Sequence, residues 1–228
     1  MIVKEFNIDH LQLKYFVGII QVRFELNQFL EDYHISNEDN ALHYLFKILE
    51  EFQNKYEASI IQLIKDNYIL NLDHLFIACY FLQKALYYET LISNKKNIEL
   101  LLYLSTHRQI NKSIKLFGLD SNDLKRGTFI LCIISPSNNI ESINNEMLKI
   151  IRAREINITI DDLTLEKIEE IIKQYDLSEL QIKAILNSYG VRSIKRETKQ
   201  NIKLLSFVIF DLICERMALL NVEKGVSH

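Results

Sequence analysis

The order of apolar and polar residues along the chain predicts short buried strands that alternate with amphipathic helices. Residues 2–6 and 15–22 are predicted strands, and the second, YFVGIIQV, is so continuously apolar that both of its faces should be covered. Residues 59–64 and 128–134 are two more apolar strands, and the segment EINITI is a candidate edge strand. The run at 128–134 is the clearest central strand, because KRG precedes it as a turn and a serine-proline pair ends it.

Helices are predicted wherever apolar residues recur at intervals of three and four positions. Asp73 is a suitable N-cap for one helix, Asp161 or Asp162 starts another, and Gly190 closes the helix that Ser178 caps. Only five glycines and one proline interrupt the chain, which favours helices over tight loops. The predicted helices span residues 24–33, 38–53, 74–88, 98–104, 139–152, 161–175, 178–189 and 198–221.

The stretch LLLYLSTHRQINKSIKLFG, residues 100–118, joins an apolar helix through a short turn to a second helix with a charged face. Thr106 and Gln109 have the spacing of a capping box, which predicts where the second helix begins. Gly118 suits the left-handed residue that closes a helix. We expect the function of the chain to lie in this stretch.

The second helix of this stretch has two distinct faces at about 100° per residue. Arg108, Lys112 and Lys115 fall within roughly 60° of one another. A helix N-terminus with free backbone N–H groups, accompanied by an arginine and two lysines, is suited to hold a phosphate. The alternative is the solvated face of an ordinary amphipathic helix. The opposite, packing face is predicted to consist of Ile110, Ile114 and Phe117.

The last predicted helix is apolar in nearly every direction within LLSFVIFDLI, residues 204–213. One of its sides should meet the rest of the fold, and the other should bind a partner. The alternative is a helix buried centrally within its own domain. The patch expected on the outer side comprises Phe207, Phe210, Met217, Leu220 and Val222.

Length and composition limit the class of protein. A chain of 228 residues with 48% hydrophobic content can bury a core, so one domain is expected. Its 27 basic and 30 acidic residues mean that a polyanion would have to bind at a local patch. Cys79, Cys132 and Cys214 are widely spaced in apolar runs, which predicts reduced core thiols. With no apolar run of membrane-spanning length and no signal-peptide order at the N-terminus, we expect a cytoplasmic protein without a membrane partner.

The sequence lacks the common motifs of nucleotide-binding and metal-dependent enzymes. Neither G-x-G-x-x-G nor G-x-x-x-x-G-K occurs, and the six histidines lack the short spacing of metal ligands. We therefore expect no catalytic residue, no metal and no cofactor. His107 and Arg108 could serve as the base and the phosphate clamp of a ribonuclease, but no second acid or base is specified nearby.

Several of these segments resemble the kinase-binding subunit of the KEOPS complex, the PRPK-binding proteins of CGI-121 type. The resemblance runs from SIIQLI through DHLFIACYFLQKAL and NIELLLYLSTHRQINKSIKLFGL to TFILCII, and resumes at LICERMALLNV in the last helix. It covers roughly two thirds of the chain, and its middle segment is the most specific part.

This resemblance implies an α+β fold, with a small, mostly antiparallel sheet of three to four strands flanked by helices. The chain would form one domain over residues 1–228, with an additional helical segment near 36–55 that shorter relatives lack. No enzymatic activity is implied. The implied subunit docks on the N-terminal lobe of the atypical KEOPS kinase and meets other KEOPS subunits through that kinase. The complex installs threonylcarbamoyl groups on the tRNA adenosine beside the anticodon, and archaeal-type members resemble receptors for the single-stranded CCA end of tRNA.

The family motif Ser-Gly-x-Arg-Gln-Ile corresponds to residues 105–110 of this chain, with Thr106 at the glycine position. A glycine lets RNA approach the backbone closely, so the threonine should change how the RNA tail is seated. Arg108 would pair with phosphate, and Gln109 would bond a base edge or maintain the cap. The implied tRNA-binding residues are His74, Ser105, Thr106, His107, Arg108, Gln109, Lys112 and Lys115. For His74, in the first turn of its helix, the alternative is a neutral partner of a nearby backbone group. The implied kinase-interface residues are Phe210, Met217, Ala218, Leu220 and Val222.

Two alternatives stand beside this two-surface subunit. The first is a kinase-binding scaffold or regulator that does not bind RNA, and it resembles some eukaryotic-type members. The second is an RNA-cleaving enzyme that uses His107. Retention of tRNA on the isolated subunit tests the first, and product formation by the pure protein tests the second.

Overall fold

The computed structural model describes residues 1–191 and 198–220. Within these residues, strands form one antiparallel sheet in the order β1-β2-β4-β3, with β5 also paired to β2. The α+β fold with a mostly antiparallel sheet is therefore confirmed, and the described residues hold one strand more than the three to four expected. The strands are β1 (Ile2–Ile8), β2 (Leu13–Phe24), β3 (Ile60–Ile64), β4 (Thr128–Ser135) and β5 (Ala153–Ile156).

The long strand β2 organises the sheet. β1 pairs with its first half, up to Ile19, and β5 pairs with its last four residues, so the two short strands follow one another along the same edge. On the other edge β4 runs beside β2, and Ile19 lies opposite Cys132, which in turn lies opposite Gln62 of β3. β4 is thus the central strand, as its continuous apolar run predicts, and β3 is an edge strand.

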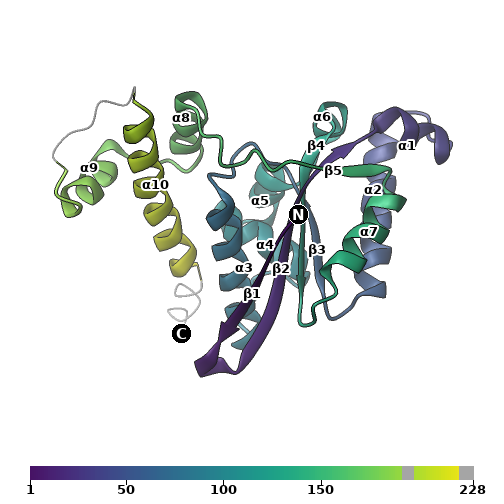
Figure 1. The fold of residues 1–228 in the computed structure, drawn as a ribbon, viewed down its shortest axis with the longest axis horizontal. Coiled ribbons are helices and arrows are strands. Elements are labelled where there is room, and N and C mark those ends of the chain that lie inside the picture. Colours follow the sequence, from purple (N-terminus) through teal and green to yellow (C-terminus); the bar gives the residue numbers. More distant parts are fainter. Residues whose placement is uncertain (192–197, 221–228) are drawn as a thin grey trace.

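Helices cover both faces of the sheet (Figure 1). The described helices are α1 (Leu26–Asp32), α2 (Glu38–Lys55), α3 (Leu72–Tyr87), α4 (Lys96–Ser105), α5 (Ile110–Phe117), α6 (Ser121–Arg126), α7 (Ile140–Ile150), α8 (Leu165–Gln174), α9 (Glu179–Ser188) and α10 (Lys199–Leu219), with a short 3-10 helix at Asp9–Leu11. α2 and α7 lie on one face, and α3 and α4 lie on the other. α10 packs outside α3, so it forms a further layer together with α8 and α9.

The core divides at the sheet because successive strand residues point to opposite faces. Val17 and Ile19 belong to the cluster beneath α3 and α4, whereas Ile20 and Val22 belong to the cluster beneath α2 and α7. Gly18 permits α7 to approach the sheet closely, since a Cβ there would lie 2.2 Å from a methyl group of Ile140. The two-sided burial predicted for YFVGIIQV is therefore confirmed.

The predicted helix starts need two corrections. α3 begins with Asn71 as its N-cap, whose side chain accepts a hydrogen bond from the backbone N–H of His74 at 2.8 Å, in place of Asp73. α8 begins with Thr164 as its N-cap, and not at the aspartate pair 161–162. Asn71 and Thr164 are both uncharged residues of the preferred N-cap types. The neighbouring aspartates are also preferred N-cap residues, so the sequence alone does not distinguish between them. α6 lies within the segment before β4, where we expected only a turn.

Candidate binding surfaces

The turn between α4 and α5 is built by a residue in the left-handed conformation. Thr106 has φ 55° and ψ 25° and closes α4, with its N–H directed at the carbonyls of Leu102 and Tyr103. The predicted capping box is therefore wrong, because Thr106 ends one helix and does not begin the next. Gln109 is the N-cap of α5, and its side chain makes no cap hydrogen bond.

Buried hydroxyl groups join α4 to α5 below this turn. The Oγ atoms of Ser105 and Ser113 lie 2.6 Å apart, and the Ser113 hydroxyl also donates to the carbonyl of Gln109 at 3.2 Å. Both serines are buried. The prediction that Ser105 contacts RNA is therefore wrong for a direct contact, since its side chain fixes the turn from inside.

The charged face of α5 is accessible. Lys112 and Lys115 are exposed, as is Gln109, while Thr106, His107 and Arg108 are half-buried. We call residues 106–115 the cationic turn. Because no side chain caps the N-terminus of α5, its first-turn N–H groups and the nearby cations face the same region, which suits an anionic ligand.

The apolar face of α5 is rotated from the predicted one. Phe117 is buried as expected, but Ile110 and Ile114 are each 39% exposed, and Ser113 takes the buried position instead. The Ser105–Ser113 contact sets this rotation. Gly118 also differs from prediction, since it is extended with φ −74° and is needed because a Cβ would lie 2.7 Å from the Ile114 carbonyl oxygen.

Arg108 connects the cationic turn to the end of α10. Its Nη1 donates a hydrogen bond to the backbone carbonyl of Leu220 at 2.8 Å. Leu220 is the C-cap of α10, where carbonyl groups lack partners within the helix and where the helix dipole favours a positive charge. The two surfaces that the sequence predicts as separate therefore meet at one guanidinium group.

A further arginine contributes to the positive charge here. Arg216 of α10 donates to the backbone carbonyls of Tyr175 and Asp176 at the end of α8, the second at 3.1 Å. Burial, followed by the charges of Lys112 and Arg216, lowers the pKa of His107, so its imidazole is neutral at neutral pH. No local pattern in the sequence identifies Arg216, because only the packing of α10 brings it near the turn.

His74 lies in the core beneath this region. Its ring is completely buried, Nδ1 accepts the N–H of Leu70 at 3.2 Å, and Nε2 lies 3.3 Å from the carbonyl oxygen of Leu104. The hydroxyl of Tyr175 lies 3.3 Å from the same ring nitrogen and donates to Leu104 at 2.5 Å. Burial lowers the pKa of His74 to about 4. His74 is thus a neutral partner of nearby backbone groups, as the alternative interpretation predicts, and its buried ring does not support a direct RNA contact.

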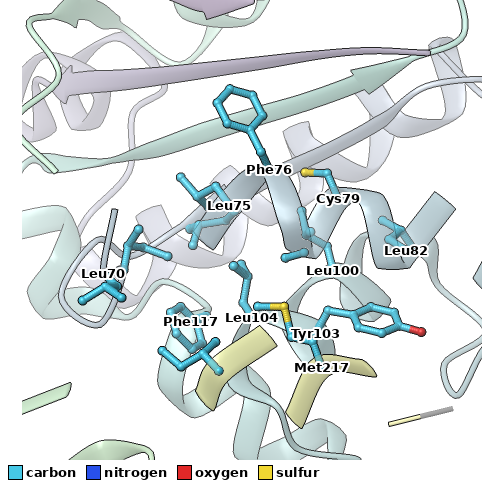
Figure 2. Packing of buried hydrophobic residues seen from close by; sticks show 14 of the residues in the cluster. Leu70, Leu75, Phe76, Cys79, Leu82, Leu100, Tyr103, Leu104, Phe117 and Met217 are labelled. Atoms are coloured by element: carbon cyan, nitrogen blue, oxygen red, sulfur yellow. The ribbon is translucent and has the colours of Figure 1, made fainter. Parts of the chain in front are cut away.

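The predicted patch on α10 is only partly at the surface. Met217 and Leu220 are buried in the chain's own core, so the expectation that they are exposed is wrong. Figure 2 shows Met217 in the same cluster as Tyr103 and Leu104 of α4. Val222 lies outside the described residues. α10 is therefore neither fully exposed along one side nor fully buried. Its residues that face the core are buried, and those on the opposite side are accessible to solvent.

The outer side of α10 carries a narrow apolar stripe. Phe207 is 49% exposed, Ala218 is exposed, and Phe210 and Cys214 are half-buried. These four residues follow the spacing i, i+3, i+7 and i+11, which places them on one helical face. We call them the outer stripe. Of the residues predicted for the kinase interface, the described ones on this stripe are Phe210 and Ala218.

The described residues hold neither a metal site nor a membrane-spanning helix. No group of three or more histidine, cysteine, aspartate or glutamate side chains is arranged to hold a metal ion in residues 1–191 and 198–220. In the same residues, no helix is both long and apolar enough to cross a membrane. Cys79 and Cys132 are buried free thiols with Sγ atoms 3.7 Å apart, and Cys214 is a free thiol on the outer stripe.

Comparison with known protein families identifies the family of this chain. The family model described as kinase binding protein CGI-121 matches residues 34–221. This range begins just before α2 and contains both the cationic turn and the outer stripe. No curated protein matches the sequence.

Proposed function

The chain belongs to the CGI-121 family of kinase binding proteins, and we propose that it is a non-catalytic subunit that binds the atypical kinase of a KEOPS-like complex. The family match extends over most of the chain, which confirms the family that the sequence segments resemble. The observation that carries the proposal is the apolar stripe on a helix inside the matched range.

We place the kinase-binding surface on the outer stripe. Phe207 is a large aromatic side chain with about half of its surface exposed, and apolar aromatic residues at the centre of an interface usually contribute most of the binding energy. The neighbouring Phe210, Cys214 and Ala218 extend the contact along the helix. Met217 and Leu220 are buried in the chain's own core and so support the stripe from beneath.

Charge substitution on the stripe tests this placement. Phe207→Glu should weaken binding to the KEOPS kinase of the same organism by about tenfold or more in calorimetry. Leu180→Glu is the matched control, since Leu180 is 80% exposed and belongs to α9 and not to the stripe. Equal affinities for the two variants, with both folded by circular dichroism, would place the interface elsewhere.

We propose that the cationic turn binds the single-stranded CCA end of tRNA. Lys112, Lys115 and the uncapped N-terminus of α5 offer donors for phosphates, and Ile110 offers an exposed apolar surface beside them for a base. Arg108 adds charge but also holds α10, so its role is shared. In this function the chain supports threonylcarbamoyl modification of the tRNA adenosine beside the anticodon.

Binding of tRNA with and without its CCA end tests the RNA surface. Lys112→Glu should weaken binding of the intact tRNA by about tenfold at low salt, and should reduce the slope of log K against log salt by about 0.7. Lys149→Glu, on the exposed side of α7, is the control and should bind as the unmodified chain does. An equal loss of tRNA affinity in both variants would contradict a specific site. So would an equal effect of Lys112→Glu on the binding of tRNA that lacks CCA.

The second candidate function is a kinase-binding scaffold without RNA binding. The observation that favours it is Thr106, because its left-handed backbone carries a side chain where the family motif has glycine. An isolated chain that binds the kinase but retains no tRNA would support this alternative. The ribonuclease reading of His107 predicts cleaved product from the pure protein.

A further inference from the structure

A hollow of about 640 Å³ opens at the free edge of β3, on a different part of the molecule from the outer stripe. α2 forms one wall, and the start of α4 together with Ile114 and Gly118 at the end of α5 forms the other. Its apolar lining includes Phe46, Leu49, Ile98, Leu101 and Ile114. Its size lies within the range of pockets that hold small molecules.

Two glutamines at this edge, Gln53 and Gln62, differ in how many hydrogen bonds their side-chain amides make. The Oε1 of Gln53 accepts the N–H of Ile61 at 3.0 Å, and its Nε2 donates to the carbonyl of Ser59 at 2.5 Å. Gln53 thus covers backbone groups that an edge strand leaves open. Both ends of its amide are used.

Gln62 is used at one end only. It is 4% exposed and lines the hollow, and its Nε2 donates to the carbonyl of Leu63 at 2.8 Å. Its Oε1 is buried without a hydrogen-bond partner in the part of the chain that the structure describes. Exchanging the two ends would set oxygen against the Leu63 oxygen, so the unpaired atom is an acceptor. Buried acceptors of this kind are usually paired, and a rotation of the Gln62 side chain toward the hollow that it lines would let a donor on a ligand pair this one.

The rim of the hollow carries charges of both signs in similar number, since Lys47, Lys95, Lys96, Glu50 and Glu57 all line it. Lys95 and Glu50 face each other across it at 3.2 Å. Phe46 and Ile114 are large apolar side chains that remain partly exposed at its mouth. These features favour an uncharged, mainly apolar occupant over a nucleotide or an acid.

From these contacts we infer that the hollow binds a small, neutral, mainly apolar molecule that donates one N–H or O–H hydrogen bond to Gln62 Oε1. The site needs neither the kinase nor RNA. It lies on the Ile114 flank of α5, whereas Lys112 lies on the opposite flank, about 160° away around the helix.

A pair of probes that differ only in the donor tests the inference. Indole should bind the full chain in an NMR titration about tenfold more tightly than 1-methylindole, which lacks the N–H, and should shift the side-chain amide signals of Gln62. In Gln62→Met the two probes should bind equally. Ile114→Trp should abolish indole binding by filling the hollow, and it changes only a partly exposed side chain.

Three results would overturn the inference. They are equal binding of the two probes to the unmodified chain, a preference for indole that persists in Gln62→Met, and shifts from indole that map away from the hollow. If Gln62→Met does not fold, unchanged indole binding by Ile114→Trp alone would be sufficient to reject the site.

Discussion

Arg108 donates a hydrogen bond from Nη1 to the backbone carbonyl of Leu220 at 2.8 Å, although 112 positions separate the two residues. The bond joins the cationic turn to the C-terminal end of α10, which carries the outer stripe. A side chain predicted as an RNA contact therefore also stabilises the helix proposed to bind the kinase. The two proposed functions should share this residue.

Substitution of Arg108 should affect both partners. Arg108→Met removes the cation and the bond to Leu220, so we expect weaker tRNA binding and a loss of about threefold to tenfold in kinase affinity. Lys112→Met is the matched comparison, because Lys112 is exposed and should affect tRNA alone. Calorimetry with each partner measures both effects. Unchanged kinase affinity in Arg108→Met would show that the two surfaces are independent.

The buried His74 should make stability depend on pH. Burial lowers its folded pKa from 6.5 to about 4, so the unfolded chain binds a proton between these values and the folded chain does not. The contribution of the neutral His74 to the free energy of unfolding is fully present well above pH 6.5. The free energy of unfolding then falls by about 3 kcal/mol as the pH drops to 4. Urea unfolding of His74→Gln over the same range should show a distinctly smaller decline. An identical decline in both proteins would contradict the buried neutral ring.

Replacing the left-handed Thr106 with glycine should stabilise the fold. A β-branched residue at φ 55° is strained, and Thr106→Gly should raise the free energy of unfolding by roughly 0.5–1 kcal/mol. Thr164→Gly is the control, because Thr164 has φ −101° and caps α8 with its side chain. That variant should lose a few tenths of a kcal/mol. Thermal unfolding measures both, and a loss in each would indicate that Thr106 is not strained.

Lys65 should be important for stability. It is buried and pairs with Asp120 at 2.8 Å and Asp123 at 3.1 Å, so Lys65→Met leaves a buried carboxylate at Asp123 without this cation. We expect a loss of about 3 kcal/mol in the free energy of unfolding. Lys95→Met breaks the exposed pair with Glu50 and should cost less than about 1 kcal/mol. Equal losses in denaturant titrations would contradict this ranking.

The sequence predicts elements where one local pattern decides them. The apolar runs of β2 and β4 require burial on both faces, and this identifies the centre of the sheet. The spacing of Ser178 and Gln181 gives a true capping box for α9. Thr106 and Gln109 show the same spacing without forming one, because Thr106 is already the end of α4.

The candidate sites depend more on packing than on pattern. α10 is apolar in most directions, and its packing against α3, α8 and α9 decides that Met217 is inside and Phe207 outside. The depth of His74 follows from Tyr175 and Leu104, which lie far from it in sequence. Arg216 joins the positive charge near His107 for the same reason. Contacts between residues so far apart in the sequence can be identified only in the folded structure.

Hydrogen–deuterium exchange of the full chain, measured alone, with the KEOPS kinase and with tRNA, tests the two-surface function most directly. The kinase should slow exchange in residues 199–220, and intact tRNA should slow it in residues 106–115. tRNA without its CCA end should leave residues 106–115 unchanged. Protection by the kinase on α2 and α7, with none on α10, would contradict the proposed function.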